Sequence, residues 1–247
     1  MKINPNLSLK HQVLLILSLL TYAMVNGQSE VRLKKRDLKR DLELWTSEGI
    51  IRLRLSNETP LHRDNFIKLA KTGYYNDILF HRVIRQFMIQ AGDSRTKSDS
   101  ILARDTLRFK NYTIPAEFRP ELFHRRGALA AARMGDDVNP KKASSGYQFY
   151  IVQGRVFTET SLDSVEAYRL NGRKLPPSHR EIYKTIGGAP HLDQNYTVFG
   201  EVIEGMEVVD RIAAVQTTGR AGGDKPLQQI RIRQVKLVKR KKTDRAD

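Results

Sequence analysis

Residues 80–93 read FHRVIRQFMIQAGD, and the predicted fold depends on this stretch. Phe80, Arg82 and Ile84 follow one another at the two-residue spacing of a β-strand, so the guanidinium shares a face with two large apolar side chains. After a bend that we expect in the middle of the stretch, Met88 and Gln90 again share one side. An apolar shelf with a cationic fork and an amide predicts a site for a compact, uncharged group that accepts hydrogen bonds.

The same stretch resembles the signature of the cyclophilins, a family of peptidyl-prolyl cis-trans isomerases, in which FHR, a short spacer, FMxQ and GD follow in order. So many matching positions at fixed spacing are a highly specific signal. The resemblance implies that Arg82, Phe87 and Gln90 are catalytic and that Met88 binds the substrate. The residues alone leave open an ordinary buried strand from which Arg82 reaches solvent.

Residues 127–133, GALAAAR, carry mostly small side chains between a glycine and a turn-forming GDD. Alanine favours a helix, but seven residues are too few for a stable one, and a strand is expected. The resemblance puts this strand on the floor of the substrate groove, with Ala132 and Arg133 binding the substrate. Arg133 stands where many members have asparagine. We expect it to keep the main-chain bonds and to add positive charge beside the groove.

Residues 144–154, SSGYQFYIVQG, resemble the family's SGSQFFI strand. Alternation puts Gln148, Tyr150 and Val152 on one face, and Phe149 and Ile151 on the other. The polar and aromatic face is expected to line the groove, so Gln148 and Tyr150 are predicted to bind the substrate. A plain core strand with Gln148 paired to backbone is the alternative.

A third match lies at residues 189–202, APHLDQNYTVFGEV, which resemble the family's WLDGKHVVFGKV. The resemblance implies that Leu192 forms an aliphatic wall of a proline pocket. Tyr196 stands where many members have histidine and where bacterial relatives commonly have tyrosine. His191 takes the place of a tryptophan that contacts cyclosporin, so we expect weak affinity for that drug. All three residues are predicted to bind the substrate.

Residues 1–27 have the pattern of a secretory signal: Lys2 and Lys10 precede an apolar run over residues 13–25, and small residues follow. The run is shorter than the roughly 20 residues that span a bilayer. An uncleaved anchor is the alternative. We expect cleavage near Gly27 and an exported protein, periplasmic or secreted, that begins near Gln28.

The chain contains no cysteine, which excludes disulfides, thiol catalysis and thiolate metal sites. Without residues 1–27 it keeps 41 Lys and Arg against 27 Asp and Glu, a net charge of +14. Much of this charge lies in a basic extension, residues 28–41, and in a basic and polar tail, residues 239–247. We expect both to be solvated. Weak contact with anionic surfaces is the alternative, and no interleaved aromatic residues indicate specific nucleic-acid binding.

Several short strands with two amphipathic helices, and no regular strand–helix alternation, predict a mainly β, closed antiparallel barrel. One helix is expected after Thr59 and Pro60, with Thr59 as its N-cap. The second covers residues 206–213, and a last strand with a bulge after Arg233 ends the domain. The resemblance covers about residues 42–238 and implies eight strands with a helix over each open end.

Residues 155–188 form an insertion that the minimal cyclophilin lacks. Leu162, Val165 and Tyr168 suggest one short helix. Pro176 and Pro177 are expected to end this helix, and residues 179–186 suggest a second short helix. We expect this segment to pack on the outside of the barrel; contact with the substrate is the alternative.

The implied reaction is rotation about the X–Pro peptide bond, which needs no covalent chemistry, metal or organic cofactor. The implied partners are proline-containing polypeptides, here folding exported proteins, and a monomer is expected. Two other functions stay open. One is a non-catalytic chaperone or envelope assembly factor that binds proline segments. The other is an anion-binding envelope protein in which isomerase activity is incidental.

Overall fold

The computed structural model describes residues 31–98 and 112–241, and every structural statement below concerns these residues. The chain divides into two compact units, residues 1–32 and 33–247. The fold described here is that of the second unit. The expected signal sequence and the end of the basic tail lie outside the described residues.

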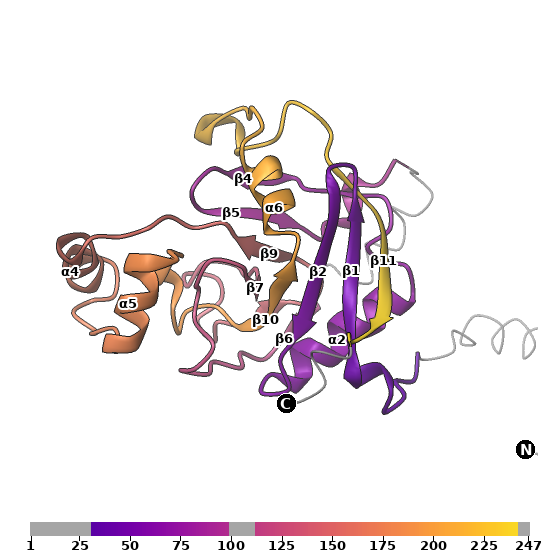
Figure 1. Ribbon diagram of the computed structural model, residues 1–247, viewed down its shortest axis with the longest axis horizontal. Coiled ribbons are helices and arrows are strands. Elements are labelled where there is room, and N and C mark those ends of the chain that lie inside the picture. The colour runs from indigo at the N-terminus through magenta and orange to yellow at the C-terminus, as the bar shows by residue number, and fades with distance from the viewer. Residues whose placement is uncertain (1–30, 99–111, 242–247) are drawn as a thin grey trace, which may run out of the picture. The chain divides into compact units, whose positions relative to one another are not determined.

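An antiparallel sheet forms the body of the unit and curls into a half-barrel (Figure 1). In the described residues it has nine strands, which lie in the spatial order β3 (Ile78–Leu79), β11 (Arg231–Lys239), β1 (Arg40–Thr46), β2 (Gly49–Leu55), β10 (Val198–Glu204), β7 (Ala128–Ala131), β9 (Phe149–Val152), β5 (Met88–Ala91) and β4 (Arg82–Ile84). A separate two-stranded sheet pairs β6 (Thr113–Ile114) with β8 (Ser144–Ser145).

The sheet is open and has nine strands in the described residues, so the expectation of a closed eight-stranded barrel is not confirmed. Its two edge strands, β3 and β4, are consecutive pieces of chain separated only by Phe80 and His81. The Phe80 N–H donates to Ile230 O beside β11 at 2.9 Å, whereas the His81 N–H donates to Gln90 O in β5 at 3.1 Å. The chain therefore changes partner within two residues, and a covalent seam replaces the hydrogen-bond ladder that would close a barrel.

Helices accompany the sheet in two groups. In the described residues the α-helices are α2 (Pro60–Lys71), α4 (Glu159–Tyr168), α5 (Pro177–Thr185) and α6 (Met206–Ala213). Short 3-10 turns are η1 (Asp37–Lys39), η2 (Ser94–Thr96), η4 (Pro190–Leu192) and η5 (Arg220–Gly222). The two expected covering helices are α2 and α6, and the two short helices of the insertion are α4 and α5. None of the helices in residues 31–98 and 112–241 is long and apolar enough to cross a bilayer.

The two faces of the sheet bury different sets of side chains. One face, with Val83, Ile89, Phe149 and Ile151, packs with α2 and α6 into the main core. Phe66 of α2 meets the Phe149 ring edge-on at a centroid distance of 5.2 Å. Burying each large apolar side chain contributes about 1.5–3 kcal/mol.

The opposite face carries a second apolar cluster that includes Met88, Ala130, Tyr150 and Val152. The expected alternation along residues 148–152 is thus confirmed for β9. We call this second side the pocket face.

The basic run before residue 42 differs from the expected solvated extension. Its acidic residues are buried: Asp37 is 6% exposed and Asp41 is fully buried. The Lys71 ammonium donates to Asp37 at 2.7 Å, and this bond holds the pKa of Asp37 below its usual range. Arg54 donates to Asp41 at 3.1 Å. The net charge of the segment did not indicate these ion pairs. Basic residues outnumber Asp37 and Asp41 locally, and the partner of each acid lies elsewhere in the fold.

The start of α2 also differs from expectation, because the Thr59 side chain makes no capping hydrogen bond. A carboxylate from elsewhere takes that role: Glu117 accepts from the main-chain N–H groups of Leu61 at 3.1 Å and His62 at 3.0 Å. It also lies 2.7 Å from the His62 Nδ1 atom. Pro60 at the first helical position agrees with the prediction.

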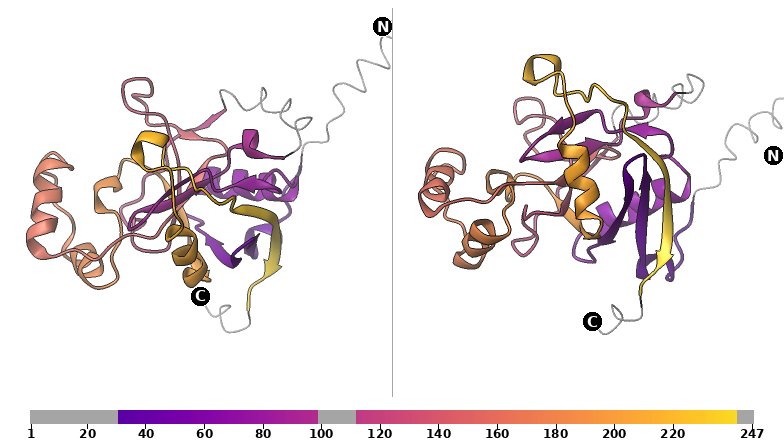
Figure 2. Two further views of the ribbon diagram at one scale, coloured as in Figure 1. Left: turned by 90° about the horizontal axis from the view of Figure 1, so that it is seen from above. Right: turned by 45° about the horizontal axis from the view of Figure 1, so that its top comes forward.

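The insertion forms a small body with a core of its own. Both views of Figure 2 show α4 and α5 lying together, away from β1, β2 and β11. Leu162, Leu170, Leu175 and Tyr183 pack there with Phe157, and Phe123 from outside the insertion packs against them. The Arg180 guanidinium contacts carboxylates of α4, among them the buried Glu166 at 2.6 Å. The insertion is therefore an ordered element rather than a long loop.

Candidate active site

Four neighbouring strands place the candidate site on the pocket face. Arg82 of β4 lies opposite Gln90 of β5, which lies opposite Tyr150 of β9, which lies opposite Ala130 of β7. Residues that face each other across a sheet point to the same side. A guanidinium, an amide, a phenol ring and a methyl group therefore form one row across four strands.

A pocket of about 240 Å³ opens over this row. Its lining consists entirely of residues that the sequence analysis proposed: Arg82, Phe87, Met88, Gln90, Ala132, Arg133, Tyr150, Leu192 and Tyr196. Met88 and Leu192 are buried, with 2% and 8% exposure, and form apolar wall. The volume and lining suit a small apolar ring with hydrogen-bonding groups on either side.

Arg82 holds its charge at the edge of the pocket. Its side chain is 42% exposed, and its Nε atom lies 3.4 Å from Asp224 Oδ2. Asp224 is held in place by the Val83 N–H, which donates to its carbonyl oxygen at 2.9 Å. Within residues 31–98 and 112–241 the guanidinium has no other hydrogen bond. Its two terminal nitrogens are therefore available to a bound ligand.

Gln148 is near the pocket but is not among its lining residues. Its Oε1 atom accepts a hydrogen bond from Gln90 Nε2 at 3.0 Å. This bond fixes the orientation of the Gln90 amide and leaves its second N–H free to point elsewhere. Gln148 thus bears on the pocket through Gln90.

Arg133 lies in the pocket wall differently from the expectation. Its side chain is only 5% exposed and pairs with Asp136 at 2.6 Å, so its charge is locally neutralised rather than added to the groove. Its Nε donates to Asn195 O at 2.7 Å, and its guanidinium carbon lies 4.5 Å from the centre of the Tyr196 ring. The side chain therefore braces Tyr196 from behind.

Some main-chain N–H and C=O groups at Ala132 and Arg133 form hydrogen bonds, and others do not. The Ala132 N–H donates to Gln148 O at 3.0 Å, and Ala132 O accepts from the Ser145 N–H at 2.7 Å. In the part of the chain that the structure describes, no hydrogen bond uses the Arg133 N–H or C=O. The main chain of Arg133 is therefore the free edge next to the pocket.

His191 lies one layer behind the pocket. It is not among the lining residues, and its ring meets the Phe87 ring at a centroid distance of 5.3 Å. The pKa of His191 is lowered to about 4, mainly by burial and to a smaller extent by the nearby charge of Arg169. The imidazole is therefore neutral near pH 7 and supports Phe87 as a flat, uncharged ring.

The sequence analysis missed a buried polar chain behind Tyr150. The Tyr150 hydroxyl lies 3.0 Å from His124 Nε2, and His124 Nδ1 lies 2.9 Å from Asp193 Oδ1. Tyr183 of the insertion donates to Asp193 Oδ2 at 2.7 Å. His124 stands alone in a basic stretch and Tyr183 lies outside the family motifs, so no spacing linked them.

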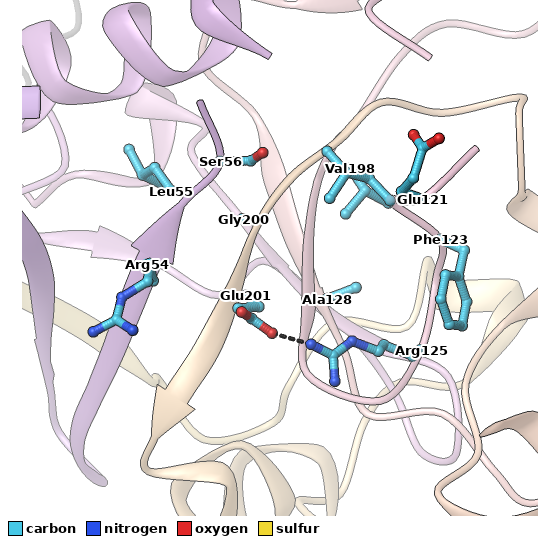
Figure 3. Close-up of a pocket in the computed structure, with 11 residues that line it drawn as sticks. Arg54, Leu55, Ser56, Glu121, Phe123, Arg125, Ala128, Val198, Gly200 and Glu201 are labelled. Atoms are coloured by element: carbon cyan, nitrogen blue, oxygen red, sulfur yellow. Dashed lines mark hydrogen bonds and ion pairs between the residues drawn. The ribbon is translucent and has the colours of Figure 1, made fainter. Parts of the chain in front are cut away.

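A second hollow of about 210 Å³ lies over β2, β10 and the segment before β7 (Figure 3). Ala128 and Val198, which belong to the apolar cluster of the pocket face, also line it. Arg125 points across it and pairs with Glu201. None of the predicted site residues lines this hollow, so the pocket around Arg82 is the candidate active site.

Comparisons with known proteins agree with this geometry. Residues 42–237 match the family model of cyclophilin type peptidyl-prolyl cis-trans isomerases. A protein of Staphylococcus saprophyticus named as a peptidyl-prolyl cis-trans isomerase is 34% identical over 201 residues, which cover 80% of this chain and 91% of that protein. A Rhizopus delemar protein named peptidyl-prolyl cis-trans isomerase-like 2 is 32% identical over 88% of this chain and 32% of its own length.

Solved structures of a Cryptosporidium parvum cyclophilin type peptidyl-prolyl cis-trans isomerase share the fold. One aligns with a TM-score of 0.57 at 23% identity and covers 82% of this chain and 99% of that one. Another, determined in the presence of the dipeptide Ala-Pro, gives a TM-score of 0.56, with 81% and 99% covered. Since the family model spans most of the sequence and the relatives exceed 30% identity, the chain belongs to the cyclophilin-type peptidyl-prolyl cis-trans isomerases, enzymes that act on proline-containing peptides.

Proposed function

We propose that this isomerase accelerates X–Pro bond rotation in proteins that have crossed a membrane, and that Arg82 drives the rotation without covalent chemistry. One observation carries the mechanism: a partly exposed guanidinium stands at the edge of an apolar pocket of about 240 Å³. The export proposal rests on the signal-like residues 1–27.

The barrier to X–Pro rotation comes from amide resonance. Resonance keeps the peptide bond planar with a barrier of roughly 18–20 kcal/mol, and uncatalysed rotation takes tens of seconds. In the twisted state the proline nitrogen regains a lone pair, which can accept a hydrogen bond that neither planar form accepts as well. A donor aimed at that nitrogen stabilises the transition state selectively. Arg82 is the donor in this proposal.

The remaining residues hold the substrate while its bond turns. Phe87, Met88, Tyr150 and Leu192 enclose the pyrrolidine ring, and Tyr196 extends the wall. The Gln90 amide, oriented by Gln148, and the free main chain of Arg133 bind the flanking carbonyl and N–H groups of the peptide. Fixing one side of the X–Pro bond while the other side rotates is what this arrangement offers chemically.

The required effect is modest for an enzyme. Bringing relaxation from tens of seconds to milliseconds takes about 5–6 kcal/mol of barrier reduction, at about 1.36 kcal/mol per tenfold. Charged hydrogen bonds contribute roughly 1.5–3 kcal/mol each. One guanidinium bond, together with a pocket that excludes water, is of the right order.

Arg82→Ala tests the mechanism in a protease-coupled assay with a short chromogenic peptide that contains one Ala-Pro bond. We expect kcat/KM to fall at least tenfold with an unchanged melting temperature, because the only group aimed at the imide nitrogen is lost. Arg85→Ala is the matched control, since Arg85 is an exposed arginine three residues away and outside the pocket. Equal rates for Arg82→Ala and the wild type would remove Arg82 from this role.

The same assay separates the enzyme from a non-catalytic binder of proline segments. A binder would show saturable peptide binding without acceleration in the wild type. A charge at Arg133 or an insertion lying over the groove would favour a binder, because either would narrow the groove against rapid turnover. Arg133 is paired with Asp136, and no insertion residue lines the pocket. We therefore expect turnover.

A further inference from the structure

Tyr150, which lines the pocket, carries a hydroxyl group that is not required for packing against an apolar ring. The Tyr150 ring lines the pocket, but the residue is only 4% exposed and its hydroxyl hydrogen-bonds with His124. Burial raises the pKa of this phenol well above its usual value, so it stays protonated. The Tyr150 hydroxyl therefore hydrogen-bonds to a residue behind the pocket.

That contact continues without a break into the insertion. His124 is fully buried and Asp193 is 3% exposed, and they are joined at 2.9 Å. Tyr183 of α5 is also fully buried, and its hydroxyl donates to Asp193 Oδ2 at 2.7 Å, at the end of this series of hydrogen bonds. Four buried side chains from three distant parts of the sequence thus form one hydrogen-bonded row, which we call the relay: Tyr150, His124, Asp193 and Tyr183.

For the His124 tautomer that carries its ring proton on Nδ1, the direction of each hydrogen bond in the relay follows from the donor and acceptor groups. An Asp193 carboxylate only accepts, and it accepts from Tyr183 OH, from the His124 main-chain N–H at 2.9 Å and from His124 Nδ1–H. His124 Nε2 is then the acceptor for the Tyr150 hydroxyl. Each donor has one acceptor, so turning any ring in the relay leaves a buried polar group unpaired, which costs about 1–3 kcal/mol.

Neighbouring contacts tie both ends of the relay to the elements that they serve. Leu192, a wall of the pocket, directly precedes Asp193. On the other side, Arg173 of the insertion donates to Asp193 O at 2.5 Å. Phe123, directly before His124, stacks on His179 of α5 at 3.8 Å. The insertion therefore contacts two chain segments: one carries Leu192, which lines the pocket, and the other carries His124, which hydrogen-bonds with Tyr150.

We propose that the insertion sets the shape of the proline pocket through this relay, with His124, Asp193 and Tyr183 as positioning residues for Tyr150 and Leu192. The inference rests on the proposed isomerase mechanism and adds to it a control point outside the pocket. The insertion then supports catalysis specifically through the Tyr183–Asp193 hydrogen bond, and ion pairs elsewhere in the insertion are not part of this route.

Removing one hydroxyl at each end of the relay tests this inference. Tyr183→Phe, Tyr150→Phe and the double variant are compared by kcat, KM and melting temperature in the peptide assay. We expect Tyr183→Phe to lower kcat/KM about three- to tenfold although it touches no substrate. The double variant should be no slower than the slower single variant, because coupled residues are not additive.

Two control variants separate the relay from general loosening. Tyr75→Phe removes a hydroxyl from a buried tyrosine in the main core, and Glu166→Gln weakens the ion pairs inside the insertion without touching Asp193. Both should keep the wild-type kcat/KM. Equal loss in Glu166→Gln and Tyr183→Phe, multiplicative loss in the double variant, or wild-type kinetics in a folded Tyr183→Phe would each overturn the inference.

A spectroscopic measurement keeps the test independent of turnover. A buried imidazole N–H donated to a carboxylate exchanges slowly, so the His124 Nδ1–H proton can be followed by nuclear magnetic resonance. We expect its signal to shift when an Ala-Pro peptide fills the pocket, and to shift less in Tyr150→Phe. An unshifted signal at saturating peptide would refute the relay. A wild-type protein that binds the peptide with this shift, but without acceleration, would refute the proposed catalysis alone.

Discussion

Next to Phe87, His191 is a half-buried residue whose ring is neutral near pH 7. Its pKa of about 4 results mainly from burial, and the charge of Arg169 adds to the effect. Holding an imidazole unprotonated against the Phe87 ring makes the folded protein sensitive to acid at that residue, because the unfolded chain binds a proton that the folded chain rejects.

The sign of this linkage gives a prediction about pH. The pKa of His191 is about 6.5 in the unfolded chain and about 4 in the fold. Its contribution to the free energy of unfolding is therefore full above about pH 6.5 and is lost as the pH falls toward 4. We expect the wild-type melting temperature to fall between pH 7 and pH 5, and His191→Phe to fall less steeply. Parallel pH profiles of the two proteins would contradict this assignment.

For single residues, the strand face on which each lies could be predicted wherever strand periodicity applies. Alternation placed Gln90 with Met88, and Tyr150 with Gln148 and Val152, within their own strands, because a two-residue period needs no knowledge of neighbours. The family resemblance, not alternation, predicted that these strands share one groove with Arg82. Alternation could not find Asp224, which meets Arg82 from 142 residues further along the chain. Nor could it show that Arg133 would be paired and buried, because its partners depend on the path of a loop.

Among the elements, α2 shows how a distant residue can complete a helix. Its first N–H groups would otherwise be unpaired in a buried place. Glu117 satisfies two of them, and its own N–H donates to the Thr197 hydroxyl at 3.0 Å. One carboxylate thus connects the start of α2 with the segment just before β10. The favourable field at a helix N-terminus adds to the stabilisation.

Glu117→Gln should lower the free energy of unfolding by about 1–3 kcal/mol, because charge-assisted bonds to the helix become neutral ones. Chemical denaturation followed by circular dichroism measures the change. Glu121→Gln, which alters an exposed carboxylate four residues away, is the matched control and should have little effect. Equal stability of Glu117→Gln and the wild type would show that the helix end needs no charged partner.

The existence of the helices was easier to predict than their ends. Apolar spacing located α2, α6 and both helices of the insertion, because amphipathic periodicity is a local property. The bulge in the last strand was also predicted correctly: Trp45 lies opposite Gln234 and Thr46 opposite Ile232, so Arg233 is the extra residue. The capping of α2 was predicted wrongly, since Glu117 lies 56 residues after Leu61, whose N–H it accepts from.

At the scale of the whole molecule, the sheet is open where a closed barrel was expected. Family resemblance and strand count gave the right class of fold. The seam at Phe80 and His81 depends on which neighbour each N–H meets, and no local pattern encodes that choice. The same limit applies to residues 33–41, where a basic composition concealed buried acids.

The export proposal makes a prediction about the complete chain. Expressed with residues 1–27, the protein should be recovered outside the cytoplasm with a new N-terminus near Gln28, as read by N-terminal sequencing. Leu15→Arg interrupts the apolar run and should leave a full-length precursor inside the cell. Leu15→Ile is the matched control and should be processed normally. A processed Leu15→Arg variant, or an unprocessed wild type, would refute a cleaved signal at this position.

The position of β11 between β3 and β1 bears on how the protein would fold during export. This strand follows every other strand in the chain, yet its neighbours come from the first third of it. A chain that crosses a membrane amino end first, as the export proposal has it, delivers β11 after all its companions, so β3 lacks its strand partner until then. We therefore expect the sheet to be completed only when passage is nearly complete.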